Sequence, residues 1–218
     1  MEGFWPYSVK ILPYLWQGMQ WTLALTAASA VCGTILGFLL ALARISRNNV
    51  INTVAKGYIT LFRGTPLLLQ ILFTYGALPQ LGLTLSGFAS VVIALSMNAG
   101  AYIAEIVRAA IQSIDRGQME AARSLGMSHS KAMRRIVLPQ TFRRLLPPMM
   151  NEMAALTKDT SMAMVVGITE LMKSSQHQMA KSAMVWQTYV WTALGYLIVT
   201  VGLNYLATYF EKKLEARG

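Results

Sequence analysis

Four long apolar runs constrain the fold of this chain more than any other feature of its sequence. They lie at about residues 20–43, 59–81, 87–110 and 184–209. Each is long enough for an α-helix to cross a hydrocarbon core of about 30 Å. The chain is 55% hydrophobic and 13% charged, which is too apolar for an ordinary soluble domain. We therefore expect an all-α membrane protein with a single transmembrane domain over residues 1–218.

A fifth run, at about 145–168, is less clear as a membrane span. Its first half carries the polar residues Asn151, Glu152, Lys158 and Asp159, and its unbroken apolar part, Met162–Ile168, is too short to cross a bilayer alone. We expect a hydropathy test to miss this span. Its assignment depends on where the basic residues lie.

The basic residues are concentrated after three of the runs, which is typical of segments on the cytoplasmic side of a membrane. Five crossings, with the N-terminus outside and the C-terminus in the cytoplasm, place all three groups inside. A four-span arrangement moves the tail outside and the 173–181 loop inside, so the charge distribution favours five spans without proving them. The three groups are Arg44, Arg47, Lys56 and Arg63; Arg108, Arg116, Arg123, Lys131, Arg134, Arg135, Arg143 and Arg144; and Lys212, Lys213 and Arg217.

The N-terminal stretch is rich in aromatic residues, and we expect it to form a short interfacial helix before the first span. Trp5, Tyr7, Tyr14, Trp16 and Trp21 lie within it. Amphipathic rings of this kind prefer the boundary between membrane and water.

Glycine and proline residues mark three further points in the apolar runs. Gly33 and Gly37 form a G-x-x-x-G pattern, which is typical of close helix contact although it is common by chance. The stretch Arg63–Pro66, at the cytoplasmic end of the second run, predicts a bend and an anchor. Pro79 with Gly82 predicts a turn in the outer loop that follows.

The segment at about 112–140 is polar and strongly basic, and its pattern is that of helix, glycine bend and helix. The stretch Met119–Leu125 predicts a helix that Gly126 closes, because glycine tolerates a left-handed conformation at this position. Ser128 is a favourable cap for a second helix, which we expect to run to about Val137 and to stop at Pro139.

The first of these two helices has small residues in its middle and polar residues at its edges. Ala121 and Ala122 allow another surface to approach closely, while Glu120 and Arg123 supply polar edges. Such a helix can dock into a groove on a soluble partner, or it can lie on anionic lipid as an interfacial amphipathic helix. A basic amphipathic pattern alone does not separate these two interpretations.

The stretch EAARSLGMSHSKAMRRIVLP, residues 120–139, resembles the EAA loop of permease subunits of binding-protein-dependent ABC importers. The Glu-Ala-Ala sequence, the glycine six residues after Glu120 and the ending Leu138-Pro139 carry this resemblance. Four stretches in the same order resemble the polar amino-acid branch, which includes histidine, glutamine, arginine and cystine permeases. The likeness runs from about Gly18 to the last residue, and the one departure is Ala109, where a glycine is often found. The four stretches are FRGTPLLLQ, AYIAEIVRAAI, GQMEAARSLG and LTKDTSM, at 62–70, 101–111, 117–126 and 156–162.

The resemblance implies the five-transmembrane-helix fold of a type I ABC importer permease (MetI-like), with a cytoplasmic coupling helix in the EAA loop. It implies a bacterial inner-membrane complex with a separate ATPase subunit, a second permease subunit that is the same or a homologous chain, and an extracytoplasmic solute-binding protein. We expect no cofactor on this chain, because it has no G-x-x-x-x-G-K-[ST] phosphate loop; ATP and Mg²⁺ are expected on the partner. The residues implied to dock on the ATPase are Glu120, Ala121, Ala122, Arg123, Leu125 and Gly126.

Polar residues of the third and fourth runs are candidates for a substrate pathway, because ionisable groups at membrane depth usually face a protein interior or a wet cavity. A zwitterionic amino acid needs an acceptor for its ammonium and a donor for its carboxylate. Glu105 or Glu152, with Lys158 or a hydroxyl group, would supply both. Pairing within the chain, of Lys158 with Asp159 or of Arg108 with Glu105, is the alternative interpretation. The candidates are Asn98, Tyr102, Glu105, Asn151, Glu152, Thr157, Lys158, Asp159 and Ser161.

Other function classes fit the sequence less well. His129 and His177 have no second ligand at metal spacing, and neither is placed as a base for an intramembrane enzyme, so we expect no metal site and no catalysis. A nucleic-acid binder would not spread its basic residues over loops between spans. We expect ATP-driven import of a polar amino acid or a close relative such as cystine. The alternative is a secondary amino-acid transporter, although the chain does not divide into the inverted repeats common in that class.

Overall fold

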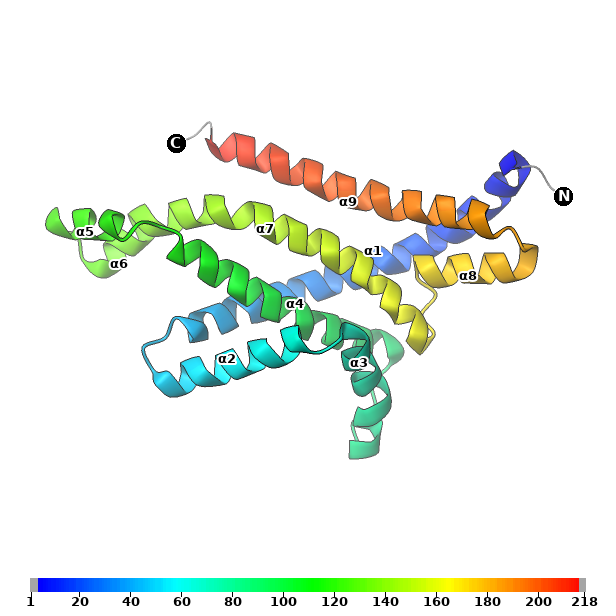
Figure 1. Ribbon diagram of the computed structural model, residues 1–218, viewed down its shortest axis with the longest axis horizontal. Coiled ribbons are helices and arrows are strands. Elements are labelled where there is room, and N and C mark those ends of the chain that lie inside the picture. Colours follow the sequence, from blue (N-terminus) through cyan, green and yellow to red (C-terminus); the bar gives the residue numbers. More distant parts are fainter. Residues whose placement is uncertain (1–3, 216–218) are drawn as a thin grey trace.

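The computed structural model describes residues 4–215, and this part of the chain is helical with short connections (Figure 1). Residues 1–3 and 216–218, and with them Arg217, lie outside the described residues. The α-helices are α1 (Phe4–Arg44), α2 (Asn49–Gly64), α3 (Leu67–Leu72), α4 (Gly87–Gln112), α5 (Arg116–Ser124), α6 (His129–Ala132), α7 (Leu138–Asp159), α8 (Leu171–Ser182) and α9 (Val185–Glu215). Two π-helical turns, Phe73–Ala77 and Met133–Val137, and two 3₁₀ segments, Leu78–Leu81 and Thr160–Val166, complete the helical part.

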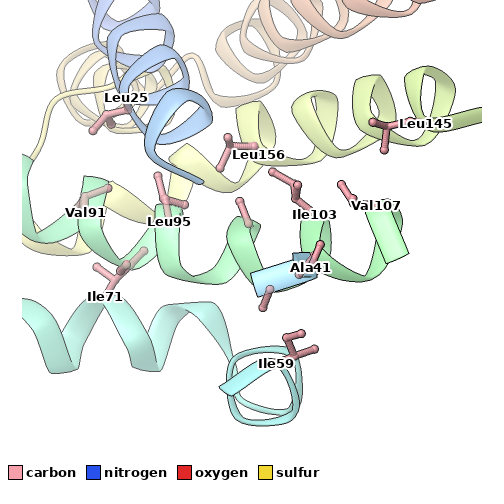
Figure 2. Packing of buried hydrophobic residues seen from close by; sticks show 14 of the residues in the cluster. Leu25, Ala41, Ile59, Ile71, Val91, Leu95, Ile103, Val107, Leu145 and Leu156 are labelled. Atoms are coloured by element: carbon pink, nitrogen blue, oxygen red, sulfur yellow. The ribbon is translucent and has the colours of Figure 1, made fainter. Parts of the chain in front are cut away.

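The helix α4 forms the centre of the bundle and contacts α1, α2 and α7. Of its most apolar stretch 67% is buried, compared with 6% for the equivalent stretch of α9. The main core gathers Leu25 and Ala41 of α1, Ile103 of α4 and Leu156 of α7 around it (Figure 2). The almost unburied α9 therefore faces the surroundings of the bundle, where lipid is expected.

The contact between α1 and α4 is as close as the glycine pattern predicted. A Cβ atom added to Gly37 would lie 2.5 Å from Cγ2 of Ile103, and one added to Gly33 would lie 3.3 Å from Cβ of Ala99. At 2.5 Å two carbon atoms repel strongly, so only glycine fits at position 37 without a shift of the neighbouring helix.

The prediction of a separate short helix at the N-terminus is wrong, because α1 is one continuous helix from Phe4 to Arg44. Its first half has a stripe of buried residues spaced four apart: Tyr7, Ile11, Leu15 and Met19. This stripe forms a second core with Leu171 and with residues of α9, so the segment is part of the bundle. Of the five aromatic residues that suggested an interfacial helix, Tyr7 is buried in this stripe, whereas Trp5, Tyr14, Trp16 and Trp21 are exposed.

The second span is broken at the place where a bend was predicted. Helix α2 ends at Gly64, and the chain resumes helical structure at Leu67 in a direction that differs by 104°. Thr65 and Pro66 between them have extended backbone, as expected for a residue before proline and for the proline itself. The expectation of one span over 59–81 is thus corrected to a bent pair, which ends at the predicted turn with Gly82 in a left-handed conformation.

The prediction that Pro139 stops the helix after Ser128 is also wrong. The chain passes from α6 through the π-helical turn Met133–Val137 directly into α7. Proline lacks the N–H for a normal helical bond and its ring clashes with the carbonyl four residues earlier. The wider π turn, closed by the bond from the N–H of Leu138 to the carbonyl of Met133, moves the preceding carbonyls away and lets the helix continue.

The loop expected after the fourth run contains a helix that the sequence reading missed, α8. The buried carboxylate of Glu170 caps its start by accepting hydrogen bonds from the N–H groups of Met172 and Lys173, both at 2.8 Å. The same carboxylate accepts a bond of 2.9 Å from the hydroxyl of Tyr196 in α9. These contacts hold α8 against the bundle.

By length and hydropathy, three helices of residues 4–215 can cross a membrane: α1, α4 and α9. The bent pair of α2 and α3 makes a fourth if it is counted as one span. Helix α7 does not pass this test, as expected for its polar sequence, but it has 22 residues and packs between α4 and α9 (Figure 1). Its expected range, 145–168, is a helix only to Asp159, followed by a 3₁₀ segment. The count of five crossings stays a prediction.

Candidate functional site

The two-helix segment Arg116–Val137, which we call the elbow, lies at one end of the long axis of the molecule, opposite the N-terminal end of α1 (Figure 1). Asp115 caps α5 by accepting a bond of 2.7 Å from the N–H of Gly117. Gly126 has a φ of 80° and follows the helix as predicted. The N–H of Gly126 donates to the carbonyl of Arg123 and that of Met127 to the carbonyl of Ala122, at 2.9 and 3.1 Å. This is the Schellman ending of a helix, which fixes the direction in which the chain leaves α5.

The second helix of the elbow starts at the predicted cap. The side-chain oxygen of Ser128 accepts a bond of 3.3 Å from the N–H of Lys131. Ala122 and Ala132 are buried where α5 packs against α6 and the π turn. The elbow is therefore a fixed, packed unit rather than a loose loop.

Most of the predicted coupling residues are on the surface of this unit. Glu120, Ala121, Arg123 and Gly126 are exposed, and the side chain of Leu125 is 81% exposed at the tip of α5. Ala122 is the exception, because it packs inside the elbow. Leu125 and the polar residues around it are therefore accessible to another molecule.

Asn98, the first pathway candidate, lies against the bend between α2 and α3. Its amide donates to the carbonyl of Phe62 at 3.0 Å and to the side-chain oxygen of Gln70 at 3.1 Å. The Gln70 amide in turn donates to the carbonyls of Phe62 and Thr65 and to the Thr65 hydroxyl, at 2.9, 3.1 and 2.9 Å. The three polar side chains satisfy backbone groups that the bend leaves without helical partners.

Tyr102 lies one turn further along α4 and faces the end of α2. The guanidinium carbon of Arg63 is 5.0 Å from the centre of the Tyr102 ring, a cation–π contact. Both residues line a pocket of about 580 Å³, together with Glu105, Arg108, Arg144 and Pro148 among others. The pocket is open on one side and is bounded by α2, α4 and α7.

Glu105 is paired within the chain, as one of the two interpretations predicted. Its carboxylate forms an ion pair of 2.6 Å with Arg108 and a longer one of 3.8 Å with Arg44. Arg108 also donates to Gln112 at 2.5 Å. Two guanidinium groups at the C-terminal ends of α1 and α4 thus surround one carboxylate, and Glu105 is less available to a solute than its sequence position suggested.

The candidates on α7 divide between two faces of the helix. Glu152 and Asp159 are seven residues apart, nearly two turns, and share a face. Both are partly buried. The charges of Asp159 and Arg63 act on Glu152, and the charge of Lys158 acts on Asp159. Lys158 is six residues from Glu152, on another face, and with Ser161 it lines a separate pocket of about 520 Å³ against α8 and α9.

The remaining two candidates on α7 have different surroundings. Thr157 is buried and donates to the carbonyl of Met153 at 2.9 Å, as a hydroxyl inside a helix often does. Asn151 is exposed. The structure thus brings Arg63, Tyr102 and Glu105 to one pocket and puts Lys158 and Ser161 in another, while Glu152 lies one helical turn beyond Pro148 of the first pocket. A pathway role for each of these residues stays a prediction.

Sequence reasoning missed Arg63 and Gln70 as members of this region. Both stand in the stretch FRGTPLLLQ, which was quoted for its resemblance; Arg63–Pro66 was interpreted as a bend and an anchor, in a region that the resemblance places near the translocation core, and neither residue was named as a candidate. The available signal in the sequence was a polar residue, Gln70, seven residues after Arg63 and shortly after the helix-breaking Pro66. In residues 4–215 no three His, Cys, Asp or Glu side chains lie close enough to hold a metal ion.

Comparison with known proteins identifies the family. The family described as binding-protein-dependent transport system inner membrane component matches residues 33–217. The arginine transport system permease protein ArtQ of Bacillus subtilis (strain 168) is 36% identical over 210 residues, which covers 96% of each chain. The glutamine transport system permease protein GlnP of Escherichia coli (strain K12) is 34% identical over 217 residues, 99% of each chain.

Solved structures agree with this assignment. The crystal structure of an amino acid ABC transporter with histidines has a TM-score of 0.91 and 36% identity, covering 98% of this chain and 99% of that one. An inward-facing structure of the methionine ABC transporter MetNI has a TM-score of 0.77 at 20% identity, over 94% and 98%, and shows the fold alone. These matches support an ABC permease and not the secondary transporter considered as the alternative. The chain belongs to the inner-membrane component family of binding-protein-dependent transport systems and has the MetI-like fold of an ABC importer permease.

Proposed function

We propose that this chain is the permease subunit of an ATP-driven importer that moves a polar amino acid, or a close relative such as cystine, into the cytoplasm by alternating access. Its relatives carry arginine, glutamine and L-cystine in their names, and they match it over nearly their full length. The partners are an ABC ATPase, a second permease subunit and an extracytoplasmic solute-binding protein. The N-terminus is outside and the C-terminus, with the elbow, is cytoplasmic.

The exposed elbow is the observation that carries this proposal. The chain has no phosphate loop of its own, so the energy for transport comes from a partner. Leu125, at the tip of α5, is available for docking on that partner. The elbow and the C-terminal end of α9 lie toward the same end of the molecule in Figure 1, which supports a common cytoplasmic side. Family membership favours ATPase docking over a helix that lies on lipid.

The substrate is proposed to pass along the face of α7 that carries Glu152. Because Glu105 is paired with Arg108, Glu152 is the better acceptor for the ammonium group of an amino acid. Asp159 on the same face adds a second negative charge. Lys158 lines the other pocket and has a smaller part in this pathway.

The docking role is tested by purifying the tagged complex and measuring its ATPase activity and its uptake in proteoliposomes. Glu120→Ala should lower both by about fivefold or more, because it removes a polar contact at the edge of a small interface. Arg134→Ala, in the part of the elbow that would contact lipid, is the matched control and should leave both near wild type. If Arg134→Ala abolishes activity on anionic vesicles while Glu120→Ala has no effect, the elbow binds lipid and the docking role is wrong.

The substrate role is tested by comparing Glu152→Gln with Lys158→Met. We expect Glu152→Gln to reduce amino-acid uptake by about tenfold, the loss of one charge-assisted hydrogen bond, with basal ATPase activity retained. Lys158→Met should change uptake by less than about threefold. Uptake that is unchanged in Glu152→Gln would remove this residue from the pathway.

A further inference from the structure

The pocket of about 520 Å³ beside α9, which we call the α7–α9 pocket, is separate from the proposed solute pathway. Lys158 lines it from the last turn of α7, on a different face from Glu152. Ser161 lines it from the 3₁₀ segment that follows, and Tyr189 lines it from α9. Its wall is therefore a mixture of apolar surface and a small number of polar groups. The other lining residues are Met172, Thr192, Ala193, Tyr196, Leu197 and Thr200.

Three hydrogen-bond donors of this pocket have no partner within residues 4–215. The ammonium group of Lys158 and the hydroxyls of Ser161 and Tyr189 form neither a hydrogen bond nor an ion pair there. These three donors are therefore available to a bound group. The remaining hydroxyls of the pocket already donate to acceptors within the chain, and they belong to Thr192, Tyr196 and Thr200.

Among the described residues, Lys158 has no counter-ion in contact with it. The carboxylate of the neighbouring Asp159 feels the charge of Lys158, but the two side chains leave α7 about 100° apart and form no ion pair. An ammonium group at membrane depth is costly unless it meets an anion or water. An anionic group is therefore the ligand that suits this pocket.

The α7–α9 pocket lies near one boundary of the membrane and opens toward the surroundings of the bundle. Only 6% of the most apolar stretch of α9 is buried. Tyr189 is 43% exposed and Trp186, nearly one turn before it, is 62% exposed, and such rings prefer the boundary between membrane and water. From Tyr189 to Thr200 the pocket extends about 16 Å along α9, roughly half of a hydrocarbon core of about 30 Å. Tyr189 thus lies at the headgroup level, which the long side chain of Lys158 can reach.

We propose that the α7–α9 pocket binds one phospholipid of the leaflet nearest α8. The ammonium group of Lys158 and the hydroxyls of Tyr189 and Ser161 donate to the phosphate, and one acyl chain lies along α9 over Leu197 toward Thr200. Under the proposed topology this is the outer leaflet. The site is independent of the solute that the chain transports.

Charge and shape favour a lipid over a second copy of this chain in the pocket. A copy offers few carboxylates to Lys158, because Glu105 is already paired, Glu170 is buried, and Glu152 and Asp159 are partly buried. A phospholipid carries an anionic phosphate and an apolar chain in one molecule, which matches both parts of the wall. A second copy is therefore an outcome of the test.

The experiment measures where a lipid binds on the purified permease–ATPase complex in neutral detergent. The probe is dioleoylphosphatidylglycerol with a photoactivatable group in one acyl chain, and labelling of residues 193–200 is followed by peptide mass spectrometry as the probe is titrated. The competitors are unlabelled dioleoylphosphatidylglycerol, dioleoylglycerol, which has the same chains without the phosphate, and glycerol phosphate, which has the phosphate without the chains. Dioleoylglycerol should compete at least about tenfold more weakly than the phospholipid, and glycerol phosphate should not compete.

Lys158→Met should raise the half-saturating concentration of the probe by about tenfold or more, because it removes the charged donor and keeps the length of the side chain. Lys158→Arg should stay within about threefold of wild type. Tyr189→Phe, which keeps the ring, should raise the concentration by about three- to tenfold, and it tests the site even where Lys158→Met does not assemble with the ATPase. Lys181→Met removes an exposed charge from the last turn of α8, outside the pocket, and is the matched control with labelling near wild type.

Other results overturn the proposal, and they identify what the pocket does instead. If Lys158→Met is labelled like wild type, or if dioleoylglycerol competes as well as the phospholipid, the pocket does not recognise a phosphate. Displacement of the probe by glycerol phosphate would make it a site for a soluble anion. Absence of labelling at residues 193–200 in wild type contradicts the proposal in itself. If Lys158→Met in addition lowers the number of permease copies per complex, measured by light scattering, a second copy covers the pocket.

Discussion

Two regions of the molecule are shaped by different physical constraints. One is the contact between α1 and α4, and the other is the elbow, which follows α4 in the chain. At the contact, Gly37 is required by space, because a Cβ atom would collide with Ile103. In the elbow, Gly126 has nothing within 4 Å of its would-be Cβ atom, and it is required by its φ of 80°. The first glycine serves the packing of the bundle, and the second sets the direction of an exposed surface.

This difference separates stability from coupling. Close packing of the bundle core contributes to the stability of the fold, so small changes of side-chain volume there lower the free energy of unfolding. An exposed elbow contributes little burial of its own, so changes there leave the fold intact and alter what the surface can bind. Substitutions in the two regions should therefore affect different measurements.

The largest effect is expected for Gly126→Val, which places a β-branched residue in a left-handed conformation. The cost of about 1–3 kcal/mol should be relieved by redirecting the chain between α5 and α6. Uptake in proteoliposomes should fall by about tenfold or more, while the thermal midpoint of the purified permease shifts by only a few degrees. A large loss of thermal stability with normal uptake per folded molecule would break the comparison between the two regions.

Gly37→Ala should show the opposite behaviour. The added methyl group meets Ile103, and we expect a loss of about 1–3 kcal/mol in the free energy of unfolding, with near-normal uptake per folded complex. Gly57→Ala, where nothing lies within 4 Å, is the control. It should be neutral or stabilising by about 0.5–1 kcal/mol, because alanine is the better helix former. Equal thermal midpoints for the two variants would mean that the α1–α4 contact is looser than described.

Gln70→Leu tests the polar part of the packed region, where α4 meets the bend between α2 and α3. The substitution keeps the size of the side chain but removes its bonds to Phe62, Thr65 and Asn98. We expect a loss of about 1–2 kcal/mol, measured by chemical unfolding in detergent. Gln20→Leu, at an exposed position on α1, is the reference and should stay within about 0.5 kcal/mol of wild type.

The smallest effect is expected for Arg108→Gln. It breaks the 2.6 Å ion pair with Glu105, but Arg44 at 3.8 Å remains to balance the carboxylate. The loss should be about 0.5–1 kcal/mol and should decrease as salt is added, since the pair is partly exposed. A loss several times larger, independent of salt, would show that this pair belongs to the packed core rather than to its edge.

Most of the fold could be predicted from the sequence where one physical signal dominates. The apolar runs predicted the membrane-spanning parts of α1, α4 and α9. Gly126 predicted the end of α5, and Ser128 predicted the start of α6. A bend was predicted at Arg63–Pro66, where proline restricts the residue before it. The glycine pair in α1 was only a candidate for close helix contact, because the motif is common by chance, and the structure shows that Gly37 does contact α4 closely.

The errors arise where tertiary contacts override a local signal. Pro139 was predicted to stop the helix, but the π turn before it removes the clash between the proline ring and the preceding backbone carbonyl. The segment around Tyr7 and Ile11 was interpreted as an interfacial helix because it is rich in aromatic residues. The sequence does not show that the bundle covers one face of this segment. In the candidate site, Glu105 and Lys158 seemed equivalent to Glu152 until the structure showed which charges are paired and which face each occupies.

The π turn before α7 has a mechanical consequence. From His129 to Glu152 the chain is helical without a break, and Pro147 and Pro148 lie within this stretch. A rod of these residues is about 36 Å long at 1.5 Å each, so tilting its elbow end by about 5° displaces the far end by roughly 3 Å. A carboxylate moved by that distance gains or loses a hydrogen bond, so under the proposed function a small displacement of the elbow by the ATPase would be enough to change how Glu152 binds a solute.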